Sequence, residues 1–96
     1  MVPLGKLFLD DGAVTAVIRK GRSLLPAGIT KVDGKFEANE SVSLCNRDGK
    51  EIARGISNYS SSDILRILGS QSEDIPKLLG FDGEETVIHR DNLVSL

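Results

Sequence analysis

Near its C-terminus the chain reads TVIHRDNLV over residues 86–94, an apolar strand pattern that is interrupted by four consecutive polar residues. These four supply an imidazole, a guanidinium, a carboxylate and an amide, and Ile88 and Leu93 flank them. Surface strands rarely need so many different hydrogen-bonding groups in succession. We therefore predict a final strand over Thr86–Leu96 that bends at a polar knot made of Arg90, Asp91 and Asn92.

The polar knot allows two interpretations. In the structural one, Arg90 and Asp91 satisfy backbone groups where the final strand bends to close a barrel, because buried polar groups must be paired. In the functional one, the knot is a surface for RNA or for another domain. The structural interpretation is favoured, since polar side chains bond to local backbone more often than to ligands.

Length and composition indicate one globular domain. Ninety-six residues leave no room for a second core, and the mixture of charged and aliphatic residues is ordinary. The formal net charge of -2 argues against a protein whose main function is to bind the phosphates of nucleic acid. The single cysteine, Cys45, cannot form an intrachain disulfide, and no targeting pattern is present, so we expect a cytoplasmic location. The apolar runs are far shorter than a membrane span, so no membrane partner is expected.

Apolar periodicity and turn residues predict strands that outnumber helices. Lys6–Asp10 is typical of a short buried strand, and it is followed by a helix that Asp10 or Asp11 caps and Gly21 ends. Ser23–Phe36 has the pattern of a strand, a bend and a second strand.

Two glycine turns and two serine caps complete the pattern. The pairs Asp33-Gly34 and Asp48-Gly49 each predict a tight hairpin turn. Ser60 and Ser72 each predict a capped helix start. The resulting order is typical of a mixed α/β, mainly β fold, in which helices decorate a small barrel of short strands.

No catalytic or metal site is predicted. The triplet His89-Arg90-Asp91 also occurs in the catalytic loop of protein kinases, but the glycine-rich loop, strand lysine and metal-binding aspartate that such enzymes need are absent from the sequence. One histidine and one cysteine are too few for a zinc site, and no base can be assigned to Cys45. Asp82-Gly83-Glu84-Glu85 lacks the ligand spacing of a calcium loop.

Three separated blocks give the chain a family resemblance. SLLPAG (Ser23–Gly28), ARGISNYS (Ala53–Ser60) and the final stretch Thr86–Val94 together resemble the C-terminal PUA domain of the glutamate 5-kinase family. The resemblance implies a PUA-like pseudo-barrel of short strands with two to three helices. It also implies that residues 1–4 are a start or linker segment and that residues 5–96 are the PUA domain.

The same resemblance implies that this chain is an accessory part of a larger enzyme. In this family an N-terminal amino-acid-kinase domain uses ATP and Mg2+ to phosphorylate L-glutamate to L-glutamyl 5-phosphate in proline biosynthesis. We therefore expect neither kinase activity nor a cofactor in this fragment. Its expected role is regulatory or architectural, through contacts with the kinase domain of the same chain or in a homo-oligomer of the parent. The alternative is an RNA-binding PUA module, free-standing or from an RNA-modifying enzyme.

One compact basic cluster follows the first predicted helix. In PUA domains that bind RNA, the first helix, the turn after it and the last strand face the RNA. The candidate surface for RNA or for a domain contact is therefore Arg19, Lys20, Gly21, Arg22, His89 and Arg90. As an alternative, Arg19 and Lys20 merely complement the helix dipole. So few cations in an acidic domain predict weak affinity for phosphates.

The chain departs from the family pattern at one turn. Members of the family usually carry Gly-Asp where this chain has Asn39-Glu40. Asparagine is the residue that best replaces glycine at a left-handed position, and glutamate preserves the charge. We therefore predict the same turn, with Asn39 in the left-handed conformation.

Overall fold

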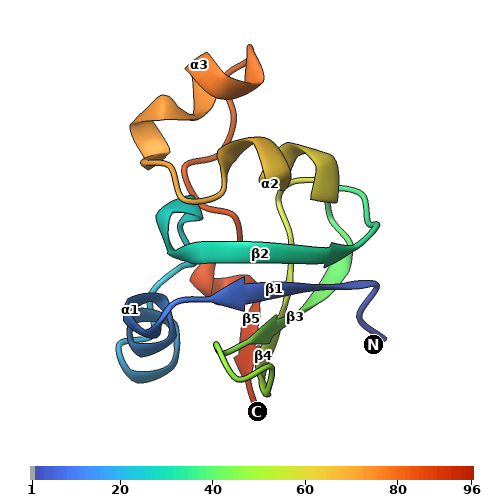
Figure 1. Ribbon diagram of the computed structural model, residues 1–96, viewed down its shortest axis with the longest axis vertical. Helices are drawn as coiled ribbons and strands as arrows, with labels where there is room; N and C mark the ends of the chain where they lie inside the picture. The colour runs from blue at the N-terminus through green and yellow to red at the C-terminus, as the bar shows by residue number, and fades with distance from the viewer. Residues whose placement is uncertain (1) are drawn as a thin grey trace.

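A coiled five-stranded sheet dominates the computed structural model, which describes residues 2–96. The strand order is β2-β1-β3-β4-β5, in which β1 and β3 are parallel and the other neighbours are antiparallel. In Figure 1, β1 and β2 run horizontally while β5 runs vertically, so the sheet twists strongly from one edge to the other. The strands are β1 Gly5–Leu9, β2 Ile29–Gly34, β3 Ser41–Cys45, β4 Glu51–Ile56 and β5 Leu93–Ser95.

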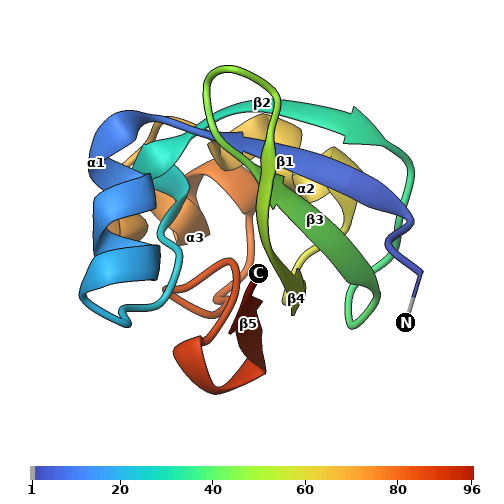
Figure 2. The ribbon, with the colours of Figure 1, turned by 90° about the horizontal axis from the view of Figure 1, so that it is seen from below.

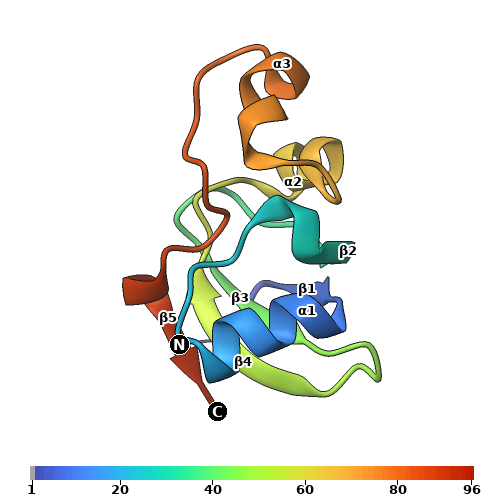
Figure 3. The same ribbon diagram turned by 90° about the vertical axis from the view of Figure 1, so that its left-hand side faces the viewer.

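Helices cover two separate parts of this sheet. The first helix and its π-helical continuation lie beside β1, whereas the second helix packs on β2 and carries the third helix on its far side. Figures 1 and 3 both place α1 and α3 at opposite ends of the molecule. The helical elements are α1 Asp11–Val14, η1 Thr15–Arg19, η2 Pro26–Gly28, α2 Ser61–Ile67, η3 Ser72–Asp74, α3 Ile75–Leu79 and η4 Arg90–Asn92.

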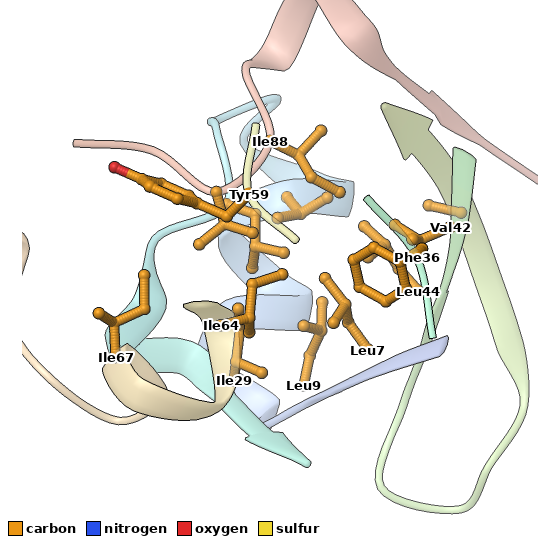
Figure 4. Packing of buried hydrophobic residues seen from close by; sticks show 14 of the residues in the cluster. Leu7, Leu9, Ile29, Phe36, Val42, Leu44, Tyr59, Ile64, Ile67 and Ile88 are labelled. Atoms are coloured by element: carbon orange, nitrogen blue, oxygen red, sulfur yellow. The ribbon is translucent and has the colours of Figure 1, made fainter. Parts of the chain in front are cut away.

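The core lies between the inner face of the sheet and α2. Strand alternation turns Leu7 and Leu9 inward from β1, and both are fully buried. Ile64 reaches the same cluster from α2, and Ile88 reaches it from the segment before η4, as Figure 4 shows. Leu24 and Ile88 form an isolated antiparallel bridge, which ties the segment after η1 to the C-terminal segment.

The structure confirms the mixed, mainly β fold class and several local predictions. The Asp10 carboxylate accepts a hydrogen bond of 2.7 Å from the Ala13 N–H and caps α1. The Ser60 hydroxyl accepts one of 3.2 Å from the Asp63 N–H at the start of α2. Asn39 has a φ of 71°, as predicted for a residue that replaces glycine in a left-handed position.

The two glycine turns behave differently. Asp48-Gly49 does join β3 to β4, in a loop closed by the hydrogen bond from the Asn46 N–H to the Lys50 carbonyl oxygen. The predicted hairpin at Asp33-Gly34 is wrong, because both residues belong to β2 and pair with β1. Gly34, with a φ of 86°, ends β2 where a side chain would approach the backbone of Gly5 within 3.1 Å.

Pairing over Thr86–Leu96 is also shorter than predicted. In that segment Ile88 forms the isolated bridge, a 3-10 turn follows, and a ladder with β4 forms over β5 alone. The bend breaks the strand because the Asn92 N–H donates to the His89 carbonyl oxygen (2.8 Å).

Two further expectations need correction. In Ser23–Phe36 the first predicted strand is reduced to the bridge residue Leu24, since the chain turns into η2 at Pro26. Ser72 does not cap the third helix, because its hydroxyl donates to the Glu85 carbonyl oxygen at 2.9 Å and so anchors the following loop instead.

Candidate functional site

The candidate surface begins where the first helix ends. The Lys20 N–H donates to the Thr15 carbonyl oxygen (3.2 Å), and the Arg22 N–H donates to the Ala16 carbonyl oxygen (3.0 Å). These wide π-type bonds unwind the helix end, and Gly21 reverses the chain with a φ of 61°. The cationic side chains of this turn are consequently exposed to solvent.

The second half of the surface comes from η4. The Ser23 hydroxyl accepts a hydrogen bond of 2.9 Å from the Arg90 N–H, across 67 residues of sequence. The His89 Nδ1 accepts one of 3.1 Å from the Asp91 N–H, and it lies 3.5 Å from a carboxylate oxygen of the same aspartate. Ser23 and His89 therefore fix the bend.

The polar knot itself is solvent-exposed. We expected the Arg90 and Asp91 side chains to bond to local backbone at the bend. The hydrogen bonds that hold the bend are instead made by backbone groups and by the side chains of Ser23 and His89. Within residues 2–96 the Arg90 guanidinium makes neither a hydrogen bond nor an ion pair, which leaves it available to a partner. Asn92 contributes its backbone N–H, and its side chain is exposed.

The structure brings three of the six candidate residues together. Gly21, Arg22 and Arg90 line a small hollow of about 130 Å³ between η1 and β5, whose other walls include Val17 and Leu93. Arg19, Lys20 and His89 lie outside this hollow. The lining of the hollow therefore combines two arginine residues with aliphatic residues.

A larger hollow of about 430 Å³ adjoins the first one and shares Arg22 with it. It lies between α1 and the Ser23–Gly28 block, and its lining is mostly apolar. Gly28 is required at this position because a side chain there would collide with the Cβ of Ala13. The SLLPAG block thus has a physical reason: it packs the chain closely against α1 and supplies the Ser23 hydroxyl to the bend.

A third polar cluster, missed in the sequence, lies on the outer face of the sheet. The Glu51 carboxylate accepts hydrogen bonds from the Arg54 guanidinium, at 2.9 and 3.1 Å, and from the Ser43 hydroxyl. These bonds, that from Arg54 first, lower the pKa of Glu51 to about 2, and the same carboxylate raises the pKa of Arg54. Burial raises the pKa of the neighbouring Cys45 thiol, and this residue is 1% exposed.

The Ser43–Glu51–Arg54 cluster cannot be predicted from the alternation of residues along a strand. Residues three apart in a regular strand point to opposite faces. In β4 a bulge lies between the pairs Ala53↔Leu44 and Glu51↔Cys45, and it returns Glu51 to the face of Arg54. The spacing of the two residues alone would have been read as helical, so no simple sequence signal identifies them.

The described residues offer neither a metal centre nor a membrane-spanning helix. Among residues 2–96, no group of three or more His, Cys, Asp or Glu side chains is arranged to hold a metal ion. Over the same residues, no helix has the length and apolar character needed to cross a membrane.

The architecture is that of known PUA domains. The PUA domain protein APE0525 from Aeropyrum pernix K1 superposes with a TM-score of 0.65 at 20% sequence identity, over 90% of this chain and 41% of that one. A chain of the archaeal box H/ACA sRNP Nop10-Cbf5 complex superposes with a TM-score of 0.61 at 23% identity, over 92% of this chain and 26% of that one. At these identities the likeness shows the fold alone.

Sequence comparison then gives the family. Residues 5–79 match the PUA domain family, and the chain belongs to it. The chain is 57% identical over 96 residues to glutamate 5-kinase of Microcystis aeruginosa, covering 100% of this chain and 25% of that protein. It is 58% identical over 94 residues to glutamate 5-kinase of Acaryochloris marina, covering 98% and 25% respectively. The chain thus spans about a quarter of the length of the curated relatives it matches.

Proposed function

We propose that this domain is the C-terminal accessory domain of a glutamate 5-kinase. The single observation that carries the proposal is an identity of 57–58% across nearly the whole chain to enzymes that are about four times as long. Identity at this level to one kind of enzyme, set against 20–23% to other PUA domains of known structure, favours a shared role over a shared fold alone.

Phosphoryl transfer from ATP to L-glutamate belongs, in this proposal, to the remaining three quarters of the parent enzyme. We assign residues 2–96 no step of the reaction. The domain acts instead by contacts with the kinase domain of its own chain and within a homo-oligomer. It thereby adjusts assembly and the response to proline in a cytoplasmic enzyme.

Activity measurements on two proteins test this proposal. ATP-dependent formation of glutamyl 5-phosphate is measured for the full-length enzyme and for the 96-residue domain at equal molar concentration. We expect turnover from the full-length enzyme and none from the domain. Turnover by the domain alone, or a full-length chain without glutamate kinase activity, would contradict the proposal.

A second candidate function is RNA binding. The observation that favours it is the convergence of Gly21, Arg22 and Arg90 on one hollow, in a fold shared with the H/ACA RNP that was solved bound to a substrate RNA. The net charge of -2 disfavours it, because phosphate binding needs clustered cations.

Amide shifts in a labelled domain decide this second candidate. A structured RNA is added at near-physiological salt, and the variant Arg22→Ala is compared with Lys35→Ala, an exposed lysine after β2. RNA binding predicts saturable shifts around Lys20–Arg22 and at Arg90, weakened by Arg22→Ala alone. Absent shifts, or equal effects of both variants, reject a site at this surface.

A further inference from the structure

The outer face of the sheet carries a row of side chains that the proposed function does not use. The pairing registers place Asp33, Lys6, Ser43 and Arg54 side by side across β2, β1, β3 and β4. Cys45 and Glu51 follow in the next row. Figure 2 views β1 and β3 from the side away from α2, and no described helix lies over them there. We call these six residues the outer sheet face: Lys6, Asp33, Ser43, Cys45, Glu51 and Arg54.

The outer sheet face is hollowed. A depression of about 410 Å³ is lined by these six residues, and its rim includes Pro3 and Leu4. Leu4 is 50% exposed and Val2 is 82% exposed, so two aliphatic side chains at the entry of the chain project into solvent. Figure 2 shows this N-terminal segment at the outer end of β1, beside the same face. The depression therefore lies beside the first described residues of the domain.

The polar groups that line the depression are partly arranged already. The Ser43–Glu51–Arg54 group is held by its own hydrogen bonds. Leu4, which also lines the depression, is fixed in place because its N–H donates to the Ser41 carbonyl oxygen at 2.8 Å.

Lys6 supplies a cation to the same face. It pairs with Asp33 in the register and its charge contributes to the lowered pKa of Glu51, yet within residues 2–96 it makes no hydrogen bond or ion pair. A docked segment that offers a carboxylate or carbonyl oxygen would satisfy it. An occupant with an apolar group for Leu4 and a hydrogen-bond acceptor for Lys6 would match this face.

We propose that the outer sheet face is the docking surface for the segment that immediately precedes this domain in the parent glutamate 5-kinase. This inference rests on the proposed function. About three quarters of the relatives' length lies outside the matched region, and the rim residues Pro3 and Leu4 place the connection at this face. A short tether gives a preceding segment a local concentration in the millimolar range, which favours it over a freely diffusing copy of the enzyme.

Site-directed photo-crosslinking in the full-length enzyme tests the docking surface. Lys6 is replaced by p-benzoylphenylalanine, and the matched control carries the same replacement at Lys77, an exposed lysine of α3 far from β1. Crosslinked peptides are mapped by mass spectrometry. Melting temperatures confirm that both variants are folded, and Asp33 provides a second position on the face if Lys6 does not tolerate the change.

We expect crosslinks from position 6 to residues that precede the domain in the same polypeptide, at monomer mass, in roughly tenfold greater yield than from position 77, as a tethered segment implies. A dimer band from position 6 would assign the face to a second copy and overturn the inference. Equal yields from positions 6 and 77 would overturn it as well. The readout does not depend on catalysis, so a full-length chain that crosslinks as expected but does not phosphorylate glutamate would contradict the proposed function alone.

Discussion

The substitution Gly55→Ala tests how tightly the C-terminal segment packs on β4. A Cβ at Gly55 would lie 2.8 Å from Cγ2 of Ile88 and 2.9 Å from the carbonyl oxygen of Asn92. Neither neighbour can retreat easily, because Ile88 is fully buried in the core and the Asn92 oxygen belongs to the backbone just before β5. Inserting a methyl group into such a space destabilises a protein by about 1–3 kcal/mol.

Urea unfolding of the 96-residue domain measures this loss. For a domain of this size, each kcal/mol lowers the melting temperature by about 4–8 °C. Gly12→Ala is the matched control, because the nearest atom to its new Cβ is 3.5 Å away and alanine is favoured over glycine in a helix by about 1 kcal/mol. We expect Gly55→Ala to lose stability and Gly12→Ala to keep or gain it. A loss below about 0.5 kcal/mol for Gly55→Ala, the range of ordinary surface changes, would refute the packing argument.

Three further predictions concern single side chains. The folded-state pKa of Glu51 lies below its ordinary value of 4.5, so the stabilisation from its bonds to Arg54 is complete above about pH 4.5 and is lost as the pH falls toward 2. Glu51→Gln should therefore reduce the loss of stability between pH 4.5 and 2, and an unchanged loss would be contrary evidence. Asn39→Val should destabilise the domain by about 1–2 kcal/mol, while Asn39→Gly leaves it nearly unchanged, since the φ of 71° disfavours branched residues; equal melting temperatures would be inconsistent with this. Asp10→Ala should lose about 1 kcal/mol through the helix cap, measurable by urea unfolding, whereas Asp82→Ala in the exposed loop should not.

Local chemistry was predictable from the sequence. The Asp10 and Ser60 caps depend on residues three positions away, and the loop at Asp48-Gly49 joins neighbouring strands, so each signal is contained in a short window. The left-handed turn at Asn39 was predictable for the same reason, since it reflects the conformational preference of one residue.

Long-range pairing was not predictable in this way. Asp33-Gly34 has a hairpin sequence, yet its strand pairs with β1, some 28 residues earlier, and the pattern of a short window carries no information on that choice. The bend after Ile88 is fixed by Ser23, a residue 67 positions away. The Glu51–Arg54 cluster depends on a bulge that no composition rule signals.

The candidate surface shows the same division. The resemblance indicated that the turn after the first helix and the last strand lie together, and Gly21, Arg22 and Arg90 do share a hollow. The sequence did not show that the knot side chains face solvent, because whether a polar side chain bonds to its own backbone or remains exposed depends on the surrounding packing. Binding of RNA at this surface stays a prediction, which the amide-shift titration with a structured RNA described above tests.

Removing residues 5–96 from the full-length enzyme tests the central claim most directly. The truncated and intact enzymes are compared for glutamyl 5-phosphate formation, for the proline concentration that halves this activity, and for mass in solution. An accessory domain predicts that truncation preserves ATP-dependent phosphorylation of glutamate but changes the proline response, the assembly or both. Loss of all activity in a folded truncated enzyme, or identical inhibition and mass in the two proteins, would contradict the account.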